Sequence, residues 1–198
     1  MSCFNGHPCK CSSSEPERPP IVADILPSFT SDVSSGFVQA LNGRSFQGQS
    51  GPVTLSSAEP ETFAYIFLSN PRNSHVLIAV NNITLVNFTG GIVQFQTTLT
   101  PLPTLATMPS TNVENTNCSC SFIRPCAQII SLSTTTELAL DPFTYTNLIP
   151  ALSSFELDLN GSTIIGPGCS LAILATALTD DITGTILANF RWFEICTR

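Results

Sequence analysis

Short runs of β-branched and aromatic residues, separated by Gly, Asn and Pro, make up the chain from Gly36 onward. Runs of about four to eight such residues between turn residues are typical of β-strands. The clearest runs predict strands over 63–68, 75–80, 83–88 and 92–99, with turns at 81–82 and 89–91. We see no good helix in this region.

The second half of the chain continues this pattern and adds a clear alternation. Apolar and acidic residues alternate over 155–159 (FELDL), which predicts a strand with one buried and one solvent-exposed face. The Asn160-Gly161 pair that follows is typical of a hairpin turn. Strands are also predicted over 169–178 and 185–196, and alternation in the second of these favours a core position for Trp192. Together the two halves predict an all-β fold, a jelly roll or related β-sandwich formed as one domain by residues 36–198.

Residues 1–35 differ from this body and are predicted to form an extended N-terminal arm. Prolines at 16, 19, 20 and 27 exclude a helix across the arm and favour an extended chain. It also contains an apolar patch that a solvated linker would lack: Ile21, Val22, Ile25, Leu26 and Phe29. We expect this patch to dock, either on a sheet edge of another subunit by strand addition or back onto its own sandwich.

A second irregular segment, residues 100–128, separates the two halves of the body. It is rich in Pro, Thr and Asn and contains three cysteines. A loop of this length in a folded domain is usually functional or covered by a partner.

The cysteines are the most informative residues of the chain. There are eight: Cys3, Cys9, Cys11, Cys118, Cys120, Cys126, Cys169 and Cys196. This number is high for a cytosolic protein and predicts an oxidising final location. The first residues lack the basic and apolar segments of a secretory signal peptide, and no apolar stretch reaches membrane-spanning length. We therefore expect a protein that is made inside a cell and oxidised after assembly or lysis, as on a spore surface or in a virion.

Two cysteine pairs, Cys9/Cys11 and Cys118/Cys120, have one residue between their members. On an extended chain the Cα atoms of such a pair lie about 6.6 Å apart, beyond the roughly 5.5–6 Å of a relaxed disulfide. Each pair is therefore better suited to bonding a second strand or loop. An arm of this length spans up to about 100 Å, whereas the body has a radius of gyration of about 15 Å. We interpret the arm as a covalent connector to another copy, and all eight cysteines are candidates for inter-subunit disulfides.

Two other interpretations of the arm cysteines remain open. The thiols could be incidental to a disordered tail. Alternatively, Cys3, His7, Cys9 and Cys11 could bind zinc, although their C-x5-C-x-C spacing lacks the C-x2–4-C pair that is usual in a zinc knuckle. We predict no metal or other cofactor.

Charge and chemistry argue against nucleic-acid binding and catalysis. The net charge is −7 and Lys10 is the sole lysine, so phosphate-binding basic patches are missing. No nucleophile elbow is present, and His75 at a predicted strand start is typical of a surface residue. Glu156 and Asp158 could form a carboxylate pair, but the alternation already explains them as a solvent-exposed face. We therefore expect a protein that is not an enzyme.

The arm cysteines and the stretch GPGCSLAIL, with Gly166 and Cys169, resemble the endospore appendage (Ena-type) fibre subunits of spore-forming Bacillus-like bacteria. Leu174 stands where that family has tyrosine, and Lys10 separates two cysteines that are adjacent there. The resemblance implies a jelly roll whose N-terminal connector is disulfide-bonded to neighbouring subunits. It also implies that Cys3, Cys9 and Cys11 belong to the connector and that Cys169 receives it.

The expected function is that of a self-assembling structural subunit of an extracellular or spore-surface fibre. Its main partner would be itself, with other spore-coat or exosporium proteins as further candidates and no nucleic-acid or membrane partner. The alternatives are a virion coat or tail protein, and a β-sandwich module that binds glycans or a receptor through Tyr65, Tyr145 or Trp192.

Overall fold

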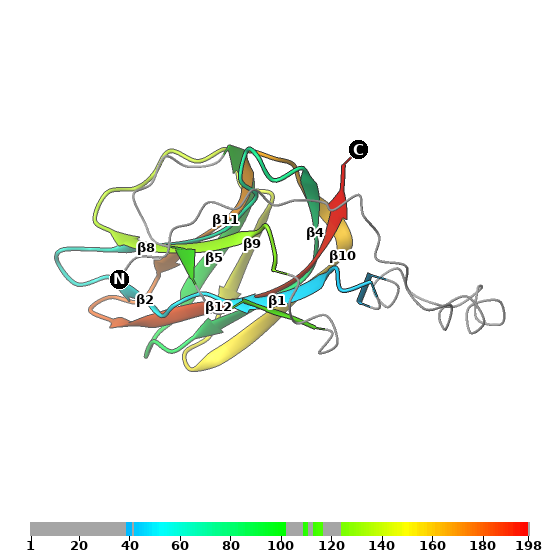
Figure 1. Cartoon of the computed structure of the whole chain (residues 1–198). Coiled ribbons are helices and arrows are strands. Elements are labelled where there is room, and N and C mark those ends of the chain that lie inside the picture. Colours follow the sequence, from blue (N-terminus) through cyan, green and yellow to red (C-terminus); the bar gives the residue numbers. More distant parts are fainter. Residues whose placement is uncertain (1–38, 41, 102–108, 111–112, 117–123, 198) are drawn as a thin grey trace, which may run out of the picture.

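Two antiparallel β-sheets packed face to face form the body of the protein (Figure 1). The structure is a computed structural model, and it describes residues 39–40, 42–101, 109–110, 113–116 and 124–197. The arm, with its cysteines and its apolar patch, lies outside these residues. Among the residues described, no helix is long and apolar enough to cross a membrane.

The first sheet, sheet A, has the order β10-β4-β12-β1-β7, with β2 also paired to β12. Its strands are β1 (Ser45–Gln49), β2 (Val53–Ser56), β4 (Val76–Asn87), β7 (Val113–Asn115), β10 (Ser153–Ile165) and β12 (Thr183–Cys196). The second sheet, sheet B, has the order β6-β8-β3-β11-β5-β9. Its strands are β3 (Phe63–Ser69), β5 (Val93–Pro101), β6 (Pro109–Ser110), β8 (Gln128–Thr134), β9 (Tyr145–Ile149) and β11 (Cys169–Ala177).

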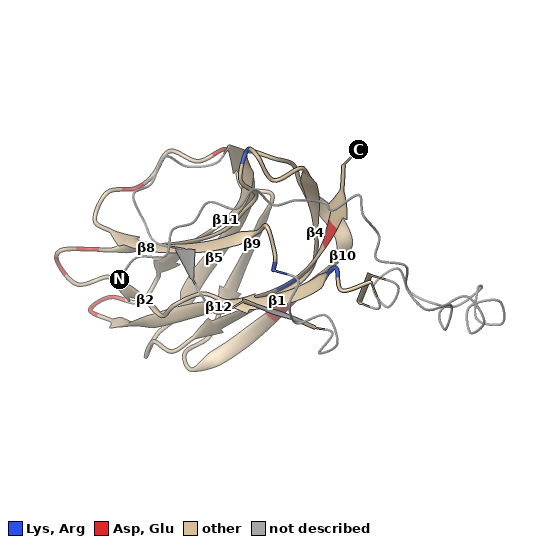
Figure 2. Ribbon diagram, in the orientation of Figure 1, with Lys and Arg blue, Asp and Glu red and all other residues tan. Residues whose placement is uncertain are grey.

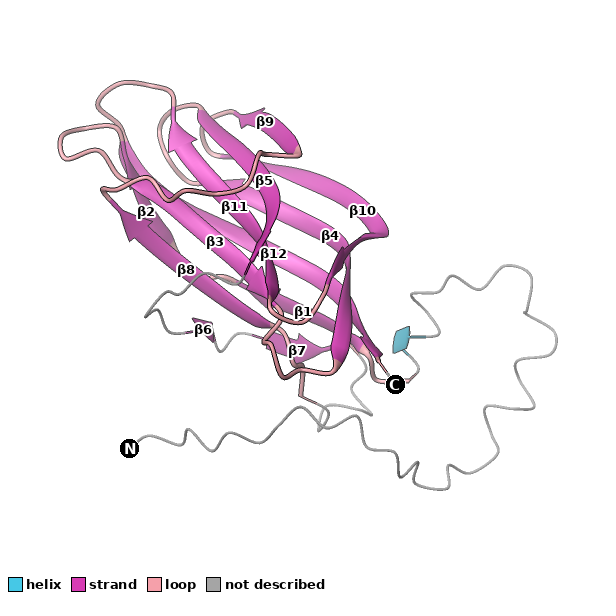
Figure 3. Cartoon of the chain, turned by 90° about the horizontal axis from the view of Figure 1, so that it is seen from above, coloured by secondary structure: helices cyan, strands magenta, loops and turns pink. Residues whose placement is uncertain are grey.

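The connectivity is that of a jelly roll, as the sequence predicted. The consecutive segments β1 and β2 both pair with β12, so together they act as one strand beside β12, β4 and β10. The facing sheet contains β3, β11, β5 and β9, and each half of the chain contributes to both sheets. The three remaining strands, β6, β7 and β8, lie between β5 and β9 in the sequence and extend the edges of the sheets. The edge strands β9 and β10 lie together at one side of the sandwich (Figure 3).

Apolar side chains from the inner faces of both sheets fill the space between them. Phe46 and Trp192 are completely buried there and stack with their ring centroids 6.0 Å apart. The core position predicted for Trp192 is therefore confirmed. A second, smaller cluster covers the outer face of sheet B, where Leu138, Leu140 and others from residues 135–144 pack over buried Tyr65 and Phe67. The β8–β9 connection thus acts as a third layer that hides apolar residues on that face.

Four predicted strands match β3, β5, β11 and β12 closely, but two predicted turns are wrong. Residues 81–82 do not end a strand, because β4 continues through them between β10 and β12, although both registers shift at Asn81. Asn82 faces the outer side of the sheet, where its amide donates a hydrogen bond to Glu156. A central strand with partners on both sides tolerates polar residues that residue type alone would assign to a turn.

The Asn160-Gly161 pair forms an irregularity inside β10 instead of a hairpin. Both residues have the positive φ expected of a turn, 49° and 74°. The pairing with β4 shifts between Asp158 and Thr163, and the strand then continues to Ile165. The local backbone preference was therefore predicted correctly, while the longer-range pairing decided that the chain does not reverse there.

Candidate functional site at one end of the sandwich

Three cysteines lie at the same end of the jelly roll. β11 begins at Cys169, β12 ends at Cys196, and Cys126 lies two residues before the start of β8. These strand ends adjoin the β3–β4 loop, residues 70–75, because β11 and β8 pair with β3 while β12 pairs with β4. We call this region the cysteine end and define it as residues 42–45, 70–75, 124–127, 166–169 and 194–197. In Figure 1 the C-terminus marks it.

The β3–β4 loop contacts the segments that contain all three cysteines. The Cys126 thiol donates a weak hydrogen bond to the carbonyl oxygen of Ser74, at 3.9 Å. The backbone N–H of Asn70 donates to the carbonyl of Cys169 at 2.9 Å. The N–H of Thr197, next to Cys196, donates to the carbonyl of His75 at 2.9 Å. The three half-buried cysteine residues are therefore held around one short loop.

The described cysteines differ in their bonding state. Cys196 is disulfide-bonded. Cys126 and Cys169 are in the thiol form and half-buried. The other five candidates, Cys3, Cys9, Cys11, Cys118 and Cys120, lie outside the described residues, so their role stays a prediction.

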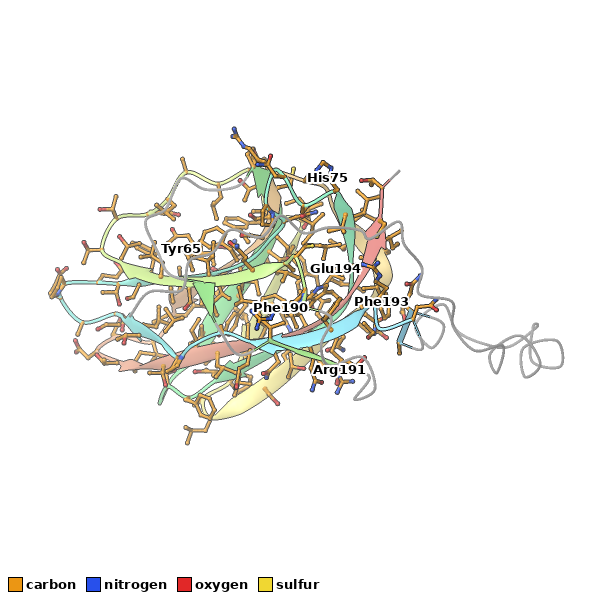
Figure 4. All side chains as sticks on the ribbon, viewed as in Figure 1. Tyr65, His75, Phe190, Arg191, Phe193 and Glu194 are labelled. Atoms are coloured by element: carbon orange, nitrogen blue, oxygen red, sulfur yellow. The ribbon has the colours of Figure 1, made fainter. Side chains whose placement is uncertain are left out.

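A buried carboxylate anchors the chain segment that leads to Cys126. Glu194 is 1% exposed and lies on the inner side of β12, near the end of the strand (Figure 4). Its oxygens accept hydrogen bonds from the N–H groups of Cys126, at 2.8 and 2.9 Å, and of Ala127, at 2.9 Å. The indole N–H of Trp192 donates to the same carboxylate at 3.2 Å. Several donors stabilise a charge at this depth, and they fix the position of Cys126 relative to β12.

A buried asparagine ties two loops of the cysteine end together. The side-chain amide of Asn70 donates to the carbonyl oxygens of Val76 and Ile165, both at 2.9 Å. These bonds join the start of β4 to the end of β10, just before the turn that leads to Cys169. Loops that would otherwise move separately are thereby linked through one fully buried side chain.

The turn before Cys169 is packed tightly against an arginine. Gly168 has a φ of 81°, and a Cβ atom there would lie 3.0 Å from Cγ of Arg72. The aliphatic part of the Arg72 side chain therefore lies over the 166–168 turn. Together with Arg44 and Arg124, it makes the described surface of the cysteine end basic (Figure 2).

The residues considered for other chemistry are dispersed. Glu156 and Asp158 are exposed on the outer side of β10, as predicted, and His75 is exposed at a φ of 54°. Within the described ranges, no group of three or more His, Cys, Asp or Glu could hold a metal ion. Tyr65 and Trp192 are fully buried, so neither can serve as the exposed platform of a binding module. Tyr145 is half-buried and stacks on Phe155 with centroids 6.1 Å apart.

Sequence reasoning missed Glu194, although the sequence contains a signal for it. Glu194 has the same parity on the strand as Phe190 and Trp192, so the alternation that buries Trp192 also directs this carboxylate inward. The basic character of the cysteine end had no such signal, because its arginines come from three separate segments that only the strand order brings together.

Comparison with known proteins identifies a family without identifying an activity. Residues 30–197 match the model of a family of unknown function, DUF6143. No curated protein and no solved structure shows a detectable match to the chain. The matched range contains the whole described sandwich and starts after the apolar patch of the arm.

Proposed function

The chain belongs to the DUF6143 family of unknown function, and we propose that it is a structural subunit that assembles with copies of itself into a fibre. The fibre would form outside the cell or on the spore surface. Its subunits would be joined by the N-terminal arm, residues 1–35, and by disulfides between the arm and the body of a neighbour. No enzymatic step is part of this proposal.

The observation that supports this proposal best is the gathering of cysteines at one end of the sandwich. Cys126, Cys169 and Cys196 come from distant parts of the sequence and surround one loop. The core is large enough to be stable without disulfide bonds. The two thiols of this end, those of Cys126 and Cys169, have a clearer use in linking the domain to another chain.

The receiving thiol would be Cys169, the position that the resemblance to endospore appendage subunits implies. Its thiol is half-buried at the start of β11, beside the 166–168 turn. A bond between this thiol and an arm thiol of another copy forms with the loss of two protons and two electrons. Molecular oxygen or a small disulfide would be the oxidant. The bond makes the non-covalent docking of the arm permanent. When those contacts open, the tethered arm rebinds at high effective concentration.

A virion coat protein is the second candidate, and the connectivity favours it specifically. Jelly rolls with this strand order are common among viral capsid proteins. The two candidates differ in the symmetry of the assembly, since a fibre grows without limit whereas a coat closes into a shell.

The test is electron microscopy of the full chain by negative staining, with and without reductant. We expect long regular filaments for the wild-type protein. Closed shells would favour the virion candidate, and dispersed monomers under all conditions would contradict assembly altogether.

A cysteine variant tests the covalent part of the proposal separately. We expect C3S/C9S/C11S to keep the folded sandwich but to give polymers that dissolve in hot detergent. The matched control is S12A/S13A/S14A, which changes three neighbouring residues of the same arm and should leave the resistance unchanged. Peptide mapping without reductant should find an arm cysteine joined to Cys169. Equal resistance of the cysteine variant and the control would contradict cross-linking through the arm.

A further inference from the structure

The end of the sandwich opposite the cysteines has its own distinct surface. It consists of four short loops, which we call the acidic end: residues 57–62, 88–92, 150–152 and 178–182. These loops connect β2 to β3, β4 to β5, β9 to β10 and β11 to β12. In Figure 1 they lie at the side away from the C-terminus.

The loops of the acidic end are bonded to one another, so their surface is preorganised. The N–H of Leu178 donates to the carbonyl of Ile92 at 2.9 Å, and that of Leu152 donates to the carbonyl of Thr89 at 3.3 Å. The hydroxyl of Ser57 donates to the carbonyl of Thr179 at 2.6 Å. Every loop of this end is therefore connected to another by a hydrogen bond. A surface fixed in this way loses little conformational entropy on binding a partner.

Large apolar side chains are exposed on this preorganised surface. Phe88 is 55% exposed, Ile92 46%, Leu152 75% and Leu178 52%. These are four of the eight large apolar side chains exposed on the described residues, and they come from three adjoining loops. Isolated exposed apolar residues need no explanation, but a cluster of them marks a binding surface.

Leu152 is unusual in its backbone as well as in its exposure. It has a φ of 51°, in the left-handed region that Gly and Asn favour. A leucine there adds backbone strain and yet buries little of its own side chain. Neither feature helps the isolated domain, so the residue fits a role in contact with a second molecule.

The charges of the two ends are complementary. The acidic end contains Glu59, Glu61, Asp180 and Asp181, all exposed, and its loops contain no Lys or Arg. The cysteine end contains Arg44, Arg72 and Arg124, and Glu194, the one acidic residue among its described residues, is buried. The described sandwich is therefore polarised along the direction of its strands.

We infer that the acidic end binds the cysteine end of a second copy, so that subunits stack head to tail along the strand direction. This inference rests on the proposed function and names the non-covalent contact within the fibre. A contact between two different surfaces of the same protein does not close on itself and generates an open filament when the rotation between copies permits. Opposite charges would guide the approach, and Phe88, Ile92, Leu152 and Leu178 would be buried in the contact.

The stacking distance is compatible with the length of the arm. β12, with 14 residues, is about 46 Å long at roughly 3.3 Å per residue, which sets the approximate repeat of such a stack. From Gln39 back to Cys11, the chain can span up to about 90 Å. An arm that starts at one cysteine end could therefore reach the cysteine end of the next copy.

Charge-reversal variants of the full chain test this contact. We expect E59K/E61K/D180K/D181K and R44E/R72E/R124E each to lower the initial rate of filament growth, followed by light scattering, by about tenfold or more. The combined variant, which carries all seven reversals, restores opposite charges on the two ends and should recover most of the wild-type rate. The matched control is E137K/D141K, which reverses two charges on the outer face of sheet B and should grow normally.

A substitution at Leu152 separates docking from folding. We expect L152N to keep or raise the thermal stability, because Asn adopts the left-handed backbone more easily, and to slow filament growth severalfold. A drop in stability that accounts for the lost growth would contradict a docking role for this side chain.

The outcomes distinguish this inference from the proposed function. Wild-type filaments together with unimpaired growth of both charge-reversed variants would overturn head-to-tail stacking and leave the fibre proposal standing. The absence of any polymer from the wild-type chain would overturn both. Growth that fails in each single-end variant and returns in the combined variant would support the stacking.

Discussion

At both ends of the sandwich, loop carbonyl groups need hydrogen-bond donors that the sheets do not supply, and the two ends provide these donors differently. Each contains a fully buried asparagine whose side chain joins neighbouring loops. The side-chain nitrogen of Asn87 at the acidic end lies within 3.1 Å of three carbonyl oxygens, those of Gly91, Ile149 and Pro150. That of Asn70 at the cysteine end bonds two. Buried amides of this kind satisfy loop carbonyls that no sheet partner can reach.

The difference lies in what the loops connect. All four loops of the acidic end are short and connect one sheet to the other. The cysteine end instead receives residues 124–127, the last part of a long connection, and holds them with the charged side chain of Glu194. The acidic end is thus closed by hydrogen bonds among its own loops. The cysteine end instead binds a segment of a long connection beside its thiols. This contrast is what a subunit with one docking end and one linking end requires.

The largest effect is expected from removing the carboxylate at the cysteine end. Glu194→Ala leaves three N–H donors without their acceptor in a dry environment, which should cost about 4 kcal/mol of unfolding free energy. Glu194→Gln keeps the shape and one acceptor oxygen, so it should cost about half as much. Denaturant unfolding measures both values.

The same pair of variants tests whether the damage is local. In Glu194→Gln, we expect the thiol of Cys126 to react faster with a thiol reagent, while the amide exchange of Leu178 and Ile182 at the acidic end stays unchanged. Equal acceleration of exchange at both ends would show that the two ends are not independent.

The two buried asparagines give the next largest effects and compare the ends directly. Asn87→Ala removes bonds to several carbonyls and to the N–H of Thr89, and it should cost about 3 kcal/mol. Asn70→Ala removes two bonds and should cost about 2 kcal/mol. Denaturant unfolding of the two variants under identical conditions should preserve this order. The reverse order would mean that the acidic end is less dependent on its side-chain hydrogen bonds than its geometry indicates.

The difference between the ends was only partly predictable from the sequence. Alternation and turn residues predicted β3, β5, β11 and β12 and the sandwich itself, because these signals are local. The acidic end combines Glu59 and Glu61 with Asp180 and Asp181, which belong to one end because the β2–β3 loop is bonded to the β11–β12 loop. The gathering of Cys126, Cys169 and Cys196 likewise follows from the strand order. Contacts of that kind leave no periodic trace in the sequence.

A third region, the outer face of sheet B between the two ends, supplies the smallest predicted effect. Tyr65 is fully buried there beneath residues 135–144, and its hydroxyl accepts a hydrogen bond from the N–H of Leu138 at 2.8 Å. Burial is the main cause that raises the pKa of Tyr65 above its usual value of 10.0, and the charge of Glu137 adds to it. The folded state therefore holds this proton more tightly than the unfolded state does. The corresponding stability is complete below pH 10 and is lost as the pH rises above that value.

Tyr65→Phe isolates this contribution. At neutral pH the variant should lose about 1 kcal/mol, because the N–H of Leu138 loses its acceptor. Between pH 10 and 11 its stability should fall less steeply than that of the wild type, since no phenol remains at this site to ionise. Tyr145→Phe, which removes the other tyrosine, should retain the steep alkaline loss, and thermal unfolding over this pH range measures all three proteins. A wild-type slope in Tyr65→Phe would mean that the third layer opens before the phenol ionises, and that this face is held less firmly than either end.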